Sequence, residues 1–264
     1  MLSPATARFA VGVLGNIISL FLYLSPVPTF IDIWRKGSVD KYSATTYLVT
    51  FLNAMLWSIY GMPFIQPNNI LVSTIAGIGL VIELVYLTLF VIYSDGKKKK
   101  LTVTFITLAE ILAVGIALAM VLFFAKTSKR RALVIGLLGD VSGVVMYAAP
   151  LSVMRQVIRT KSVEFMPLAI SVTSFANALV WTLYAIHPLD PYVAIPNGTG
   201  CILGLAQLIL YATYYKSTKA QIAARKATLK LEMGLKEVVI VTKEPNKVNS
   251  LPPNDVFTPK IIAT

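Results

Sequence analysis

Two pairs of asparagine and tryptophan have a spacing suited to ligand binding. Asn53 lies four residues before Trp57, and Asn177 lies four residues before Trp181. Residues four apart share one face of a helix, so each amide points to the same side as its indole ring. An amide both donates and accepts hydrogen bonds, whereas an indole offers a broad apolar surface. The spacing therefore predicts two helix faces that contact a ligand through polar and apolar groups together.

Chemistry of other kinds has little support. His187, the single histidine, stands next to Pro188, and no Ser/His/Asp or paired-carboxylate arrangement repeats around it. We interpret it as a surface residue. The single cysteine, Cys201, can form neither an intrachain disulfide nor a multi-cysteine metal site. The sequence therefore predicts a protein that is not an enzyme and has no metal and no cofactor.

The elements that must position these residues are predicted to be membrane helices. The chain has 264 residues, of which 56% are hydrophobic, and its mean hydropathy is +0.72. Such a chain has too little polar surface for an ordinary soluble domain. A helix needs roughly 20 apolar residues to cross the bilayer. Seven stretches are of this kind: Phe9–Phe30, Tyr47–Met62, Ile70–Tyr93, Leu101–Phe124, Leu133–Val153, Leu168–Ile186 and Val193–Tyr214.

The chain also contains an internal repeat. At an offset of 124 residues, its first half matches its second at Gly15/Gly139, Pro26/Pro150, Ser38-Val39/Ser162-Val163, Asn53-Ala54/Asn177-Ala178, Trp57/Trp181 and Tyr60/Tyr184. At an offset of 121, further matches are Gly77/Gly198, Gly79/Gly200, Leu87/Leu208 and Tyr93/Tyr214. Leucines can match by chance in apolar helices, but a register that pairs Pro, Asn, Trp, Tyr and several Gly indicates duplication.

The repeat predicts the fold class. Each copy holds three spans, so the unmatched helix Leu101–Phe124 is needed to return the chain and give both copies the same orientation. We expect an all-α membrane protein whose seven transmembrane helices form two parallel three-helix repeats joined by one linker helix. The expected parts are residues 1–96 for the first repeat, 97–131 for the linker, 132–215 for the second repeat and 216–264 for a partly disordered cytosolic tail.

Three acidic residues lie inside predicted spans, where a charge is costly and usually marks function. They are Glu83, Glu110 and Asp140. A proton-coupled symporter is therefore an alternative. In the repeat alignment Glu83 matches Gly204, and Asp140 matches Asn16. Neither acid is therefore matched by a second carboxylate. We expect a neutral or hydrogen-bonded structural role for all three.

The basic residues indicate orientation instead of nucleic-acid binding. The formal net charge is +12, but the basic residues lie in loops and the tail instead of on one folded face. Assigned alternately, the loops place all but five of the 24 lysines and arginines on one side. By the positive-inside rule that side is cytosolic and the N-terminus external. We expect the plasma membrane as the location. Ala220–Lys236 is expected to form a basic helix along the inner leaflet, with solvated disorder as the alternative.

Four strings then carry a family resemblance. They are SPVPTF (Ser25–Phe30), MYAAPLSVM (Met146–Met154), TKSVEFMP (Thr160–Pro167) and IPNGTG (Ile195–Gly200). Over about residues 8–216, the chain resembles the plant SWEET sugar transporters, a known example of a parallel repeat. The resemblance implies bidirectional, energy-independent movement of mono- or disaccharides, by alternating access between the two three-helix bundles, often in trimers.

The resemblance also implies a substrate pocket. Its matching positions are Ser19, Leu22, Asn53, Trp57, Gly143, Met146, Asn177, Trp181 and Asn197. A pyranose has apolar C–H faces and a rim of hydroxyls, so two facing tryptophans can sandwich the ring while amides bind the rim. The plainer alternatives are tryptophans at the membrane interface and amides that join helices.

Gate residues are implied in the same way. Pro26, Pro150 and Pro167 match three of the four prolines around the family's cytosolic gate, where each permits a kink. Thr46 occupies the position of the fourth, and the second helix should therefore flex less. Tyr60 and Asp190 match a pair that closes the external gate through a phenol-to-carboxylate hydrogen bond. The alternative for Asp190 is a surface turn former between two prolines.

One pocket position departs from the family. Symmetry predicts an amide opposite Asn197, but Ala76 stands there, so the pocket loses one hydrogen-bonding arm. Asn53 and Asn177 are bulkier than serine, and Leu22 should face Met146 across the axis, so we expect a narrow cavity. The family resemblance implies that larger side chains at these positions go with monosaccharides and smaller ones with sucrose. We therefore expect glucose or another hexose as the substrate, with a sucrose facilitator as the alternative.

A seven-helix receptor remains the least favoured alternative. The internal duplication argues against that class. The loop cysteines that would form a receptor's external disulfide are absent from the sequence, and so is a lysine in the seventh span.

Overall fold

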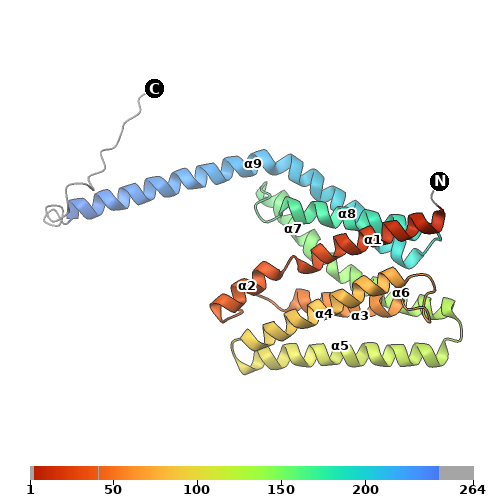
Figure 1. Ribbon diagram of the computed structural model, residues 1–264. Coiled ribbons are helices and arrows are strands. Elements are labelled where there is room, and N and C mark those ends of the chain that lie inside the picture. The colour runs from red at the N-terminus through yellow and green to blue at the C-terminus, as the bar shows by residue number, and fades with distance from the viewer. Residues whose placement is uncertain (1–2, 41, 244–264) are drawn as a thin grey trace.

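The structure, a computed structural model, describes residues 3–40 and 42–243, and residues 234–243 only in their backbone (Figure 1). This part of the chain is helical, with no strand among the described residues. Its helices are α1 (Pro4–Leu24), α2 (Val27–Lys36), α3 (Thr45–Tyr60), α4 (Ile70–Tyr93), α5 (Lys97–Phe124), α6 (Ser128–Met146), α7 (Ala148–Thr160), α8 (Leu168–Ile186) and α9 (Pro191–Lys243).

Two of the predicted spans are each divided into two helices. The first breaks between α1 and α2 at Ser25 and Pro26, and the fifth breaks between α6 and α7 at Tyr147, three residues before Pro150. Proline cannot donate a backbone hydrogen bond to the preceding turn, so a break near it is expected. With each broken pair counted as one span, the described helices make seven spans, which confirms the predicted fold class.

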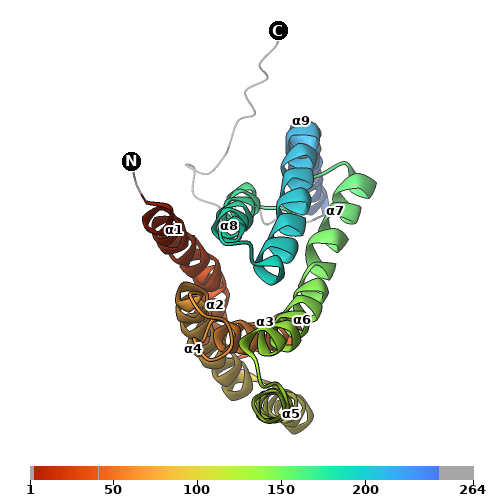
Figure 2. The ribbon, with the colours of Figure 1, turned by 90° about the vertical axis from the view of Figure 1, so that its right-hand side faces the viewer.

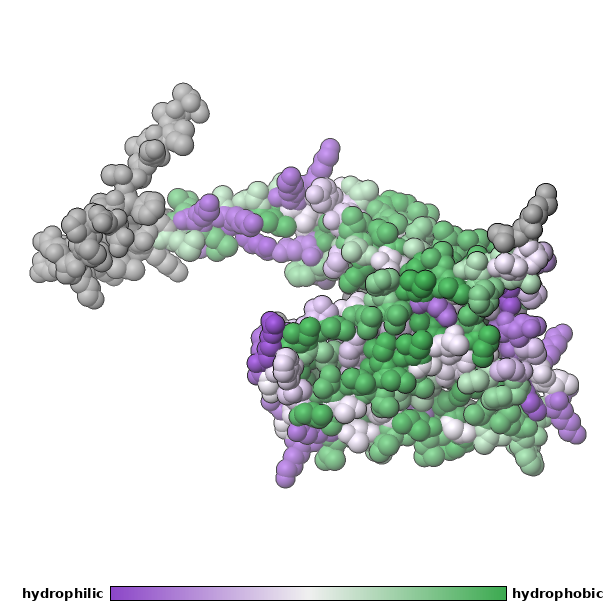
Figure 3. All heavy atoms as spheres, in the orientation of Figure 1, coloured by the Kyte–Doolittle hydropathy of each residue, from purple (hydrophilic) through white to green (hydrophobic). Residues whose placement is uncertain are grey.

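The helices have the length and surface of membrane spans. Six helical segments of the described chain are long and apolar enough to cross a bilayer, and α3, at 16 residues, is shorter. Side chains on the outside are apolar: Phe105 and Phe123 of α5 are 72% and 79% exposed. Figure 3 shows an apolar band across the visible face, with hydrophilic residues gathered toward its two ends. This surface matches hydrocarbon between two polar interfaces.

The helix contacts repeat in the two halves. We call α1–α4 the first unit and α6–α9 the second unit. In the first unit α4 packs against both α1 and α3, and in the second unit α9 packs against both α6 and α8. Across the units, α1 contacts α8 and α3 contacts α6, so each unit gives the other the same two surfaces. The linker α5 lies outside, against α3, α4 and α6, as Figure 2 shows from the N-terminal end.

Two glycines at matching repeat positions, Gly79 and Gly200, each lie next to a tyrosine. A Cβ atom on Gly79 would lie 2.1 Å from the Tyr23 ring, so only glycine lets α1 and α4 approach this closely. Gly200, the repeat partner of Gly79, faces the hydroxyl of Tyr147 at 3.5 Å from such a Cβ atom. Tyr147 is in turn the repeat partner of Tyr23. Gly79 therefore makes room for Tyr23, whereas at Gly200 the tighter contact, at 3.2 Å, is with Ala178 and the distance to Tyr147 is an ordinary contact.

The last helix continues well past the membrane-spanning part. Thr218 Oγ1 accepts a hydrogen bond of 2.8 Å from the backbone N–H of Val163, and Arg225 forms an ion pair of 2.6 Å with Glu164. These contacts hold the start of the extension against the loop between α7 and α8. The expected basic helix Ala220–Lys236 lies within α9, while the disorder expected near the C-terminus falls on residues 244–264, outside the described residues.

Candidate functional site

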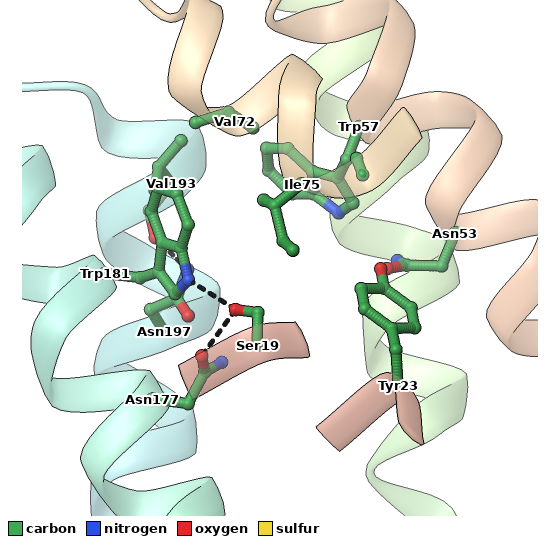
Figure 4. A pocket seen from close by; sticks show the side chains of 11 residues that line it. Ser19, Tyr23, Asn53, Trp57, Val72, Ile75, Asn177, Trp181, Val193 and Asn197 are labelled. Carbon is green, nitrogen blue, oxygen red and sulfur yellow. Dashed lines mark hydrogen bonds between the residues drawn. The ribbon is translucent and has the colours of Figure 1, made fainter. Parts of the chain in front are cut away.

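A central cavity of about 160 Å³ lies between the two units (Figure 4). Its walls come from α1, α3 and α4 of the first unit and α8 and α9 of the second. The lining residues are Ser19, Tyr23, Asn53, Trp57, Val72, Ile75, Ala76, Asn177, Trp181, Val193 and Asn197. The cavity thus combines amides, indole rings and aliphatic side chains.

A wider cavity of about 530 Å³, here called the vestibule, adjoins the central cavity. The two share Ser19, Tyr23, Asn53, Trp57, Asn177 and Asn197. From there the vestibule extends to Pro26 at the start of α2 and to the exposed Thr46 at the start of α3. Together the cavities form a path from the middle of the bundle toward the end that holds α2.

All ten predicted pocket residues line this path. Trp57, Trp181, Asn53, Asn177, Asn197, Ser19 and Ala76 line the central cavity, and Leu22, Met146 and Gly143 line the vestibule. Figure 4 shows Asn53 and Trp57 approaching from α3 and Asn177 and Trp181 from α8. Spans far apart in the sequence therefore bring both predicted pairs to one space.

On the α8 wall, Ser19 holds both members of the pair. Ser19 Oγ donates a hydrogen bond of 2.6 Å to Asn177 Oδ1 and accepts one of 3.0 Å from Trp181 Nε1. Trp181 is only 6% exposed and packs where a Cβ atom on Gly15 would be 3.0 Å away. These contacts fix the indole and the amide in one orientation, leaving the Asn177 NH₂ group toward the cavity.

On the α3 wall, the contacts are different. The repeat partner of Ser19 is Gly143, which has no hydroxyl. Asn53 Nδ2 instead donates to Ser142 Oγ at 2.8 Å. Trp57 is half-buried, and its Nε1 has no hydrogen-bond partner in the part of the chain that the structure describes. The Asn–Trp pairs therefore match between the two walls but their hydrogen bonds do not, and Trp57 keeps a donor without a partner among the described residues.

The predicted gap opposite Asn197 is present. Ala76 is 4% exposed and lines the central cavity, with no hydrogen-bonding group to offer. Asn197 Nδ2 bonds back to the Val193 carbonyl at 2.8 Å, one turn earlier in α9. The Asn197 amide therefore offers its oxygen to the cavity.

The path is closed at the end that holds the N-terminus. Tyr60 and Asp190 are 0% and 3% exposed, and the Tyr60 hydroxyl donates to Asp190 Oδ1 at 2.7 Å. Asn69, which is 1% exposed, donates to the other carboxylate oxygen of Asp190 at 2.5 Å. Asp190 therefore joins α3 and the loop before α4 to the second unit.

Arg8 and Tyr184 extend this closure. The Arg8 guanidinium donates to Asn69 Oδ1 at 2.6 Å and to the Asn68 carbonyl at 2.8 Å, and it lies 4.1 Å from the centre of the Tyr184 ring. The Tyr184 hydroxyl reaches the Asn68 carbonyl at 3.3 Å. Arg8 belongs to α1 and Tyr184 to α8, so this contact also crosses between the units.

The predicted proline set lies toward the opposite end. Pro26 and Thr46 line the vestibule. Pro150 stands in the first turn of α7, and Pro167 precedes α8 as its N-terminal cap residue. The structure thus brings Pro26 and Thr46 to the path, whereas Pro150 and Pro167 border the adjoining helix ends.

We expected a neutral or hydrogen-bonded structural role for the three acids inside spans. None of them makes a hydrogen bond to another described residue, so the neutral role stays a prediction. Glu83 Oε2, Glu110 Oε2 and Asp140 Oδ1 are buried and have no hydrogen-bond partner among the described residues. Only Glu83 lines the path, in the vestibule. No group of three or more His, Cys, Asp or Glu suited to a metal ion occurs within residues 3–40 and 42–233.

Sequence reasoning missed several residues of the site. Tyr23 and Ser142 contribute to the walls, and Arg8 and Asn69 to the closed end. A signal existed for two of them. Tyr23 matches Tyr147 at the offset of 124, and Asn69 matches Asp190 at the offset of 121.

Two duplicated three-helix units around a polar path, closed at one end, define a membrane transporter of the parallel-repeat class. A family comparison agrees and goes further. The chain belongs to the family described as "Sugar efflux transporter for intercellular exchange", whose model matches residues 9–98 and 133–219. These two stretches cover the two units and omit most of α5. The family is one of transporters, which agrees with the expectation that the chain is not an enzyme.

Individual relatives are also named as sugar transporters. The chain is 48% identical to the bidirectional sugar transporter SWEET4 of Oryza sativa subsp. indica, over 93% of this chain and 95% of that protein. It is 49% identical to SWEET7 of Arabidopsis thaliana, over 83% and 85% of the two chains. A solved structure of a eukaryotic SWEET transporter matches with a TM-score of 0.78 and 35% identity, over 80% of this chain and 98% of that one.

Proposed function

We propose that this chain is a bidirectional, energy-independent sugar facilitator for glucose or another monosaccharide. The observation that carries the proposal is the pair of Asn–Trp faces, Asn53 with Trp57 and Asn177 with Trp181, on opposite walls of one cavity (Figure 4). Indole rings can cover the apolar faces of a pyranose while amides exchange hydrogen bonds with its hydroxyls. The names of the relatives, bidirectional sugar transporters, support the same substrate class.

The size of the central cavity favours a monosaccharide. Its volume of about 160 Å³ lies below the range of roughly 300–1,000 Å³ found for pockets of drug-sized ligands. Asn53 and Asn177 narrow it from two sides, as do Leu22 and Met146 in the vestibule. A disaccharide would need both spaces at once.

We propose that the two units move relative to each other so that the path opens alternately at its two ends. Tyr60 and Asp190 form the gate at the N-terminal end, where they bond across the units. Pro26, Pro150, Pro167 and Thr46 belong to the gate at the other end, where helix breaks permit bending. The structure has the path closed at the N-terminal end and a vestibule at the opposite end, which corresponds to one of the two alternating states.

The orientation follows from charge. The basic loops and tail favour a cytosolic C-terminus and an external N-terminus, so the state described would open to the cytosol. We propose the plasma membrane as the location and a homotrimer as the assembly. The trimer rests on the family resemblance alone.

The test is tracer uptake by proteoliposomes that contain the full chain. Glucose, galactose, fructose and sucrose are compared at equal concentration, with Trp181→Ala and Asn197→Ala as variants. We expect hexose uptake that both substitutions reduce strongly. Transport of sucrose faster than hexose would refute the size argument, and absence of any sugar-dependent flux would refute the function.

A proton-coupled symporter is the second candidate. It is favoured by the buried oxygen atoms of Glu83, Glu110 and Asp140, which lack hydrogen-bond partners among the described residues. The same proteoliposomes distinguish the two. If the chain is a facilitator, glucose should reach the same concentration inside and outside the vesicles even under an imposed pH gradient. Accumulation of glucose inside, above the external concentration, would establish coupling.

A further inference from the structure

Glu83 is the one charged residue among the described residues that line the central cavity or the vestibule. It is 3% exposed, its Oε2 atom is buried without a hydrogen-bond partner, and neither oxygen is bonded to another described side chain. A carboxylate can accept about four hydrogen bonds, and leaving these unmade away from water is costly. The vestibule contents cannot reach the buried Oε2. They can reach Oε1, which is not buried and also has no hydrogen-bond partner among the described residues.

The surroundings of Glu83 favour a sugar as that partner. Tyr23 and Tyr47 line the vestibule beside it. Tyr23 packs over Gly79, which lies one helical turn before Glu83 on the same face of α4. Tyr47 is fixed from behind by Phe30, with ring centres 5.0 Å apart. Aromatic surfaces next to a hydrogen-bond acceptor suit a ligand with C–H faces and hydroxyl donors.

Helix packing does not account for the acid. The repeat partner of Glu83 is Gly204, where an added Cβ atom would lie 3.0 Å from Phe175. The second unit therefore packs the same helix position without a carboxylate, closely against Phe175. The acid is a feature of the first unit alone, on the wall of the path.

We propose that Glu83 forms a second sugar subsite in the vestibule, distinct from the space between the tryptophans and resting on the proposed sugar transport. Glu83 follows Ala76 by seven residues on α4, which corresponds to roughly 10 Å along the helix. A monosaccharide bound by Glu83 thus lies nearer the open end than one bound beside Ala76. Its hydroxyls donate to the carboxylate, and the subsite receives or releases sugar while the path is open at that end.

The test uses counterflow of labelled glucose in proteoliposomes of the full chain, inhibited by the set of monodeoxyglucoses. In the unaltered protein, one analogue should inhibit about tenfold more weakly than glucose, because it lacks the hydroxyl that donates to Glu83. In Glu83→Gln, inhibition by unlabelled glucose should be about tenfold weaker than in the unaltered protein. Inhibition by that same analogue should not become any weaker, because the contact that it lacks is already gone. This non-additivity identifies a direct contact.

Glu110→Gln is the matched control, since Glu110 also has one buried oxygen without a hydrogen-bond partner among the described residues but lies in α5 and lines neither cavity. The relative inhibition by glucose and by each monodeoxyglucose, here called the analogue profile, should be the same in Glu110→Gln as in the unaltered protein. Thermal unfolding reports whether each variant is folded. If Glu83→Gln does not fold, Glu83→Asp takes its place, with the same analogue singled out and a smaller loss.

An unchanged analogue profile in the folded Glu83 variant would overturn the subsite. Accumulation of glucose by a pH gradient that Glu83→Gln abolishes would also overturn it, in favour of a proton site. The first outcome leaves the proposed function untouched as long as the unaltered protein carries glucose and Trp181→Ala impairs it. The second would also replace the facilitator by a proton-coupled symporter. Failure of the unaltered protein to carry any sugar would instead refute both.

Discussion

Asn69 and Asp190, which occupy equivalent positions in the two repeats, meet each other at the closed end of the path. Asn69 Nδ2 donates to Asp190 Oδ2 at 2.5 Å. Their tyrosine neighbours are also equivalent: Tyr60 donates to Asp190 at 2.7 Å, and the Tyr184 hydroxyl lies 3.5 Å from Asn69 Oδ1. These four residues form the proposed gate, in which the first unit supplies an amide at the position where the second supplies a carboxylate.

Replacing that amide should make the gate depend on pH. In Asn69→Asp, two carboxylates would face each other at hydrogen-bond distance, with the single guanidinium of Arg8 beside residue 69. One cation offsets only one of the two charges, so repulsion raises the pKa of one carboxylate. The closed end should be stable at low pH, where one proton is shared, and should open as pH rises. Glucose exchange by the variant should therefore change between about pH 5 and about pH 7.5, while the unaltered protein stays nearly constant.

Asn69→Ala is the control for this prediction, because it removes the hydrogen bond without adding charge. It should alter the exchange rate by the same factor at every pH. A pH profile of Asn69→Asp that matches that of Asn69→Ala would contradict the role of charge at the gate.

Trp181 has a hydrogen-bond partner, whereas Trp57 has none among the described residues. Adding a hydroxyl beside Trp57 should therefore change sugar binding. Gly143 is the repeat partner of Ser19, and a Cβ atom there would have only Asn53 Nδ2 near it, at 3.9 Å. Gly143→Ser should therefore fit and bond Trp57 as Ser19 bonds Trp181. With this donor occupied, glucose should bind more weakly, by a factor of about ten for one lost hydrogen bond.

The measurement is the half-saturation concentration in glucose counterflow, with Gly143→Ala as the control for added volume. The alanine variant should stay near the unaltered protein. Equal weakening in both variants would mean that volume and not hydrogen bonding is responsible.

Ser19 should matter for stability as well as for binding. Ser19→Ala would leave the buried Trp181 N–H without its 3.0 Å partner. An unsatisfied buried donor costs about 1–3 kcal/mol, so thermal unfolding of the purified protein should occur at a lower temperature. The Asn177 amide would also lose its 2.6 Å contact and turn more freely, which should weaken discrimination between hexoses. Unchanged melting and unchanged selectivity would show that this hydrogen-bond pair is unimportant.

Gly79 and Gly77 give a matched test of the α1–α4 contact. Gly79→Ala would place a methyl group 2.1 Å from the Tyr23 ring, and overpacking of this kind costs about 1–3 kcal/mol. Gly77→Ala meets no atom within 4 Å, so it should be neutral or slightly stabilising through better helix propensity. Thermal unfolding in detergent compares the two. A similar loss in both variants would contradict the steric explanation.

The architecture and most of the central site could be predicted from the sequence. Spans are local features of composition, and α4 and α8 begin and end where the hydropathy indicated. The repeat matched Asn53 with Asn177 and Trp57 with Trp181, and the geometry repeats too: each tryptophan lies edge-on to the following tyrosine at 5.2 Å and 74°. The helical spacing that puts Asn and Trp on one face depends only on the local backbone.

The tertiary structure alone decided which of these equivalent residues are held and which are free. Ser19 bonds Asn177 and Trp181 across 158 and 162 residues, and Arg8 reaches the loop before α4 across 61. Such contacts depend on the rotation of each helix against its neighbours, which the packing of the whole bundle sets. The sequence by itself thus determined a duplicated membrane bundle with paired Asn–Trp faces. Only the packing decided that Trp181 is bonded while Trp57 is not, and that Asn69 and Asp190 close one end, because side chains distant in the chain meet only there.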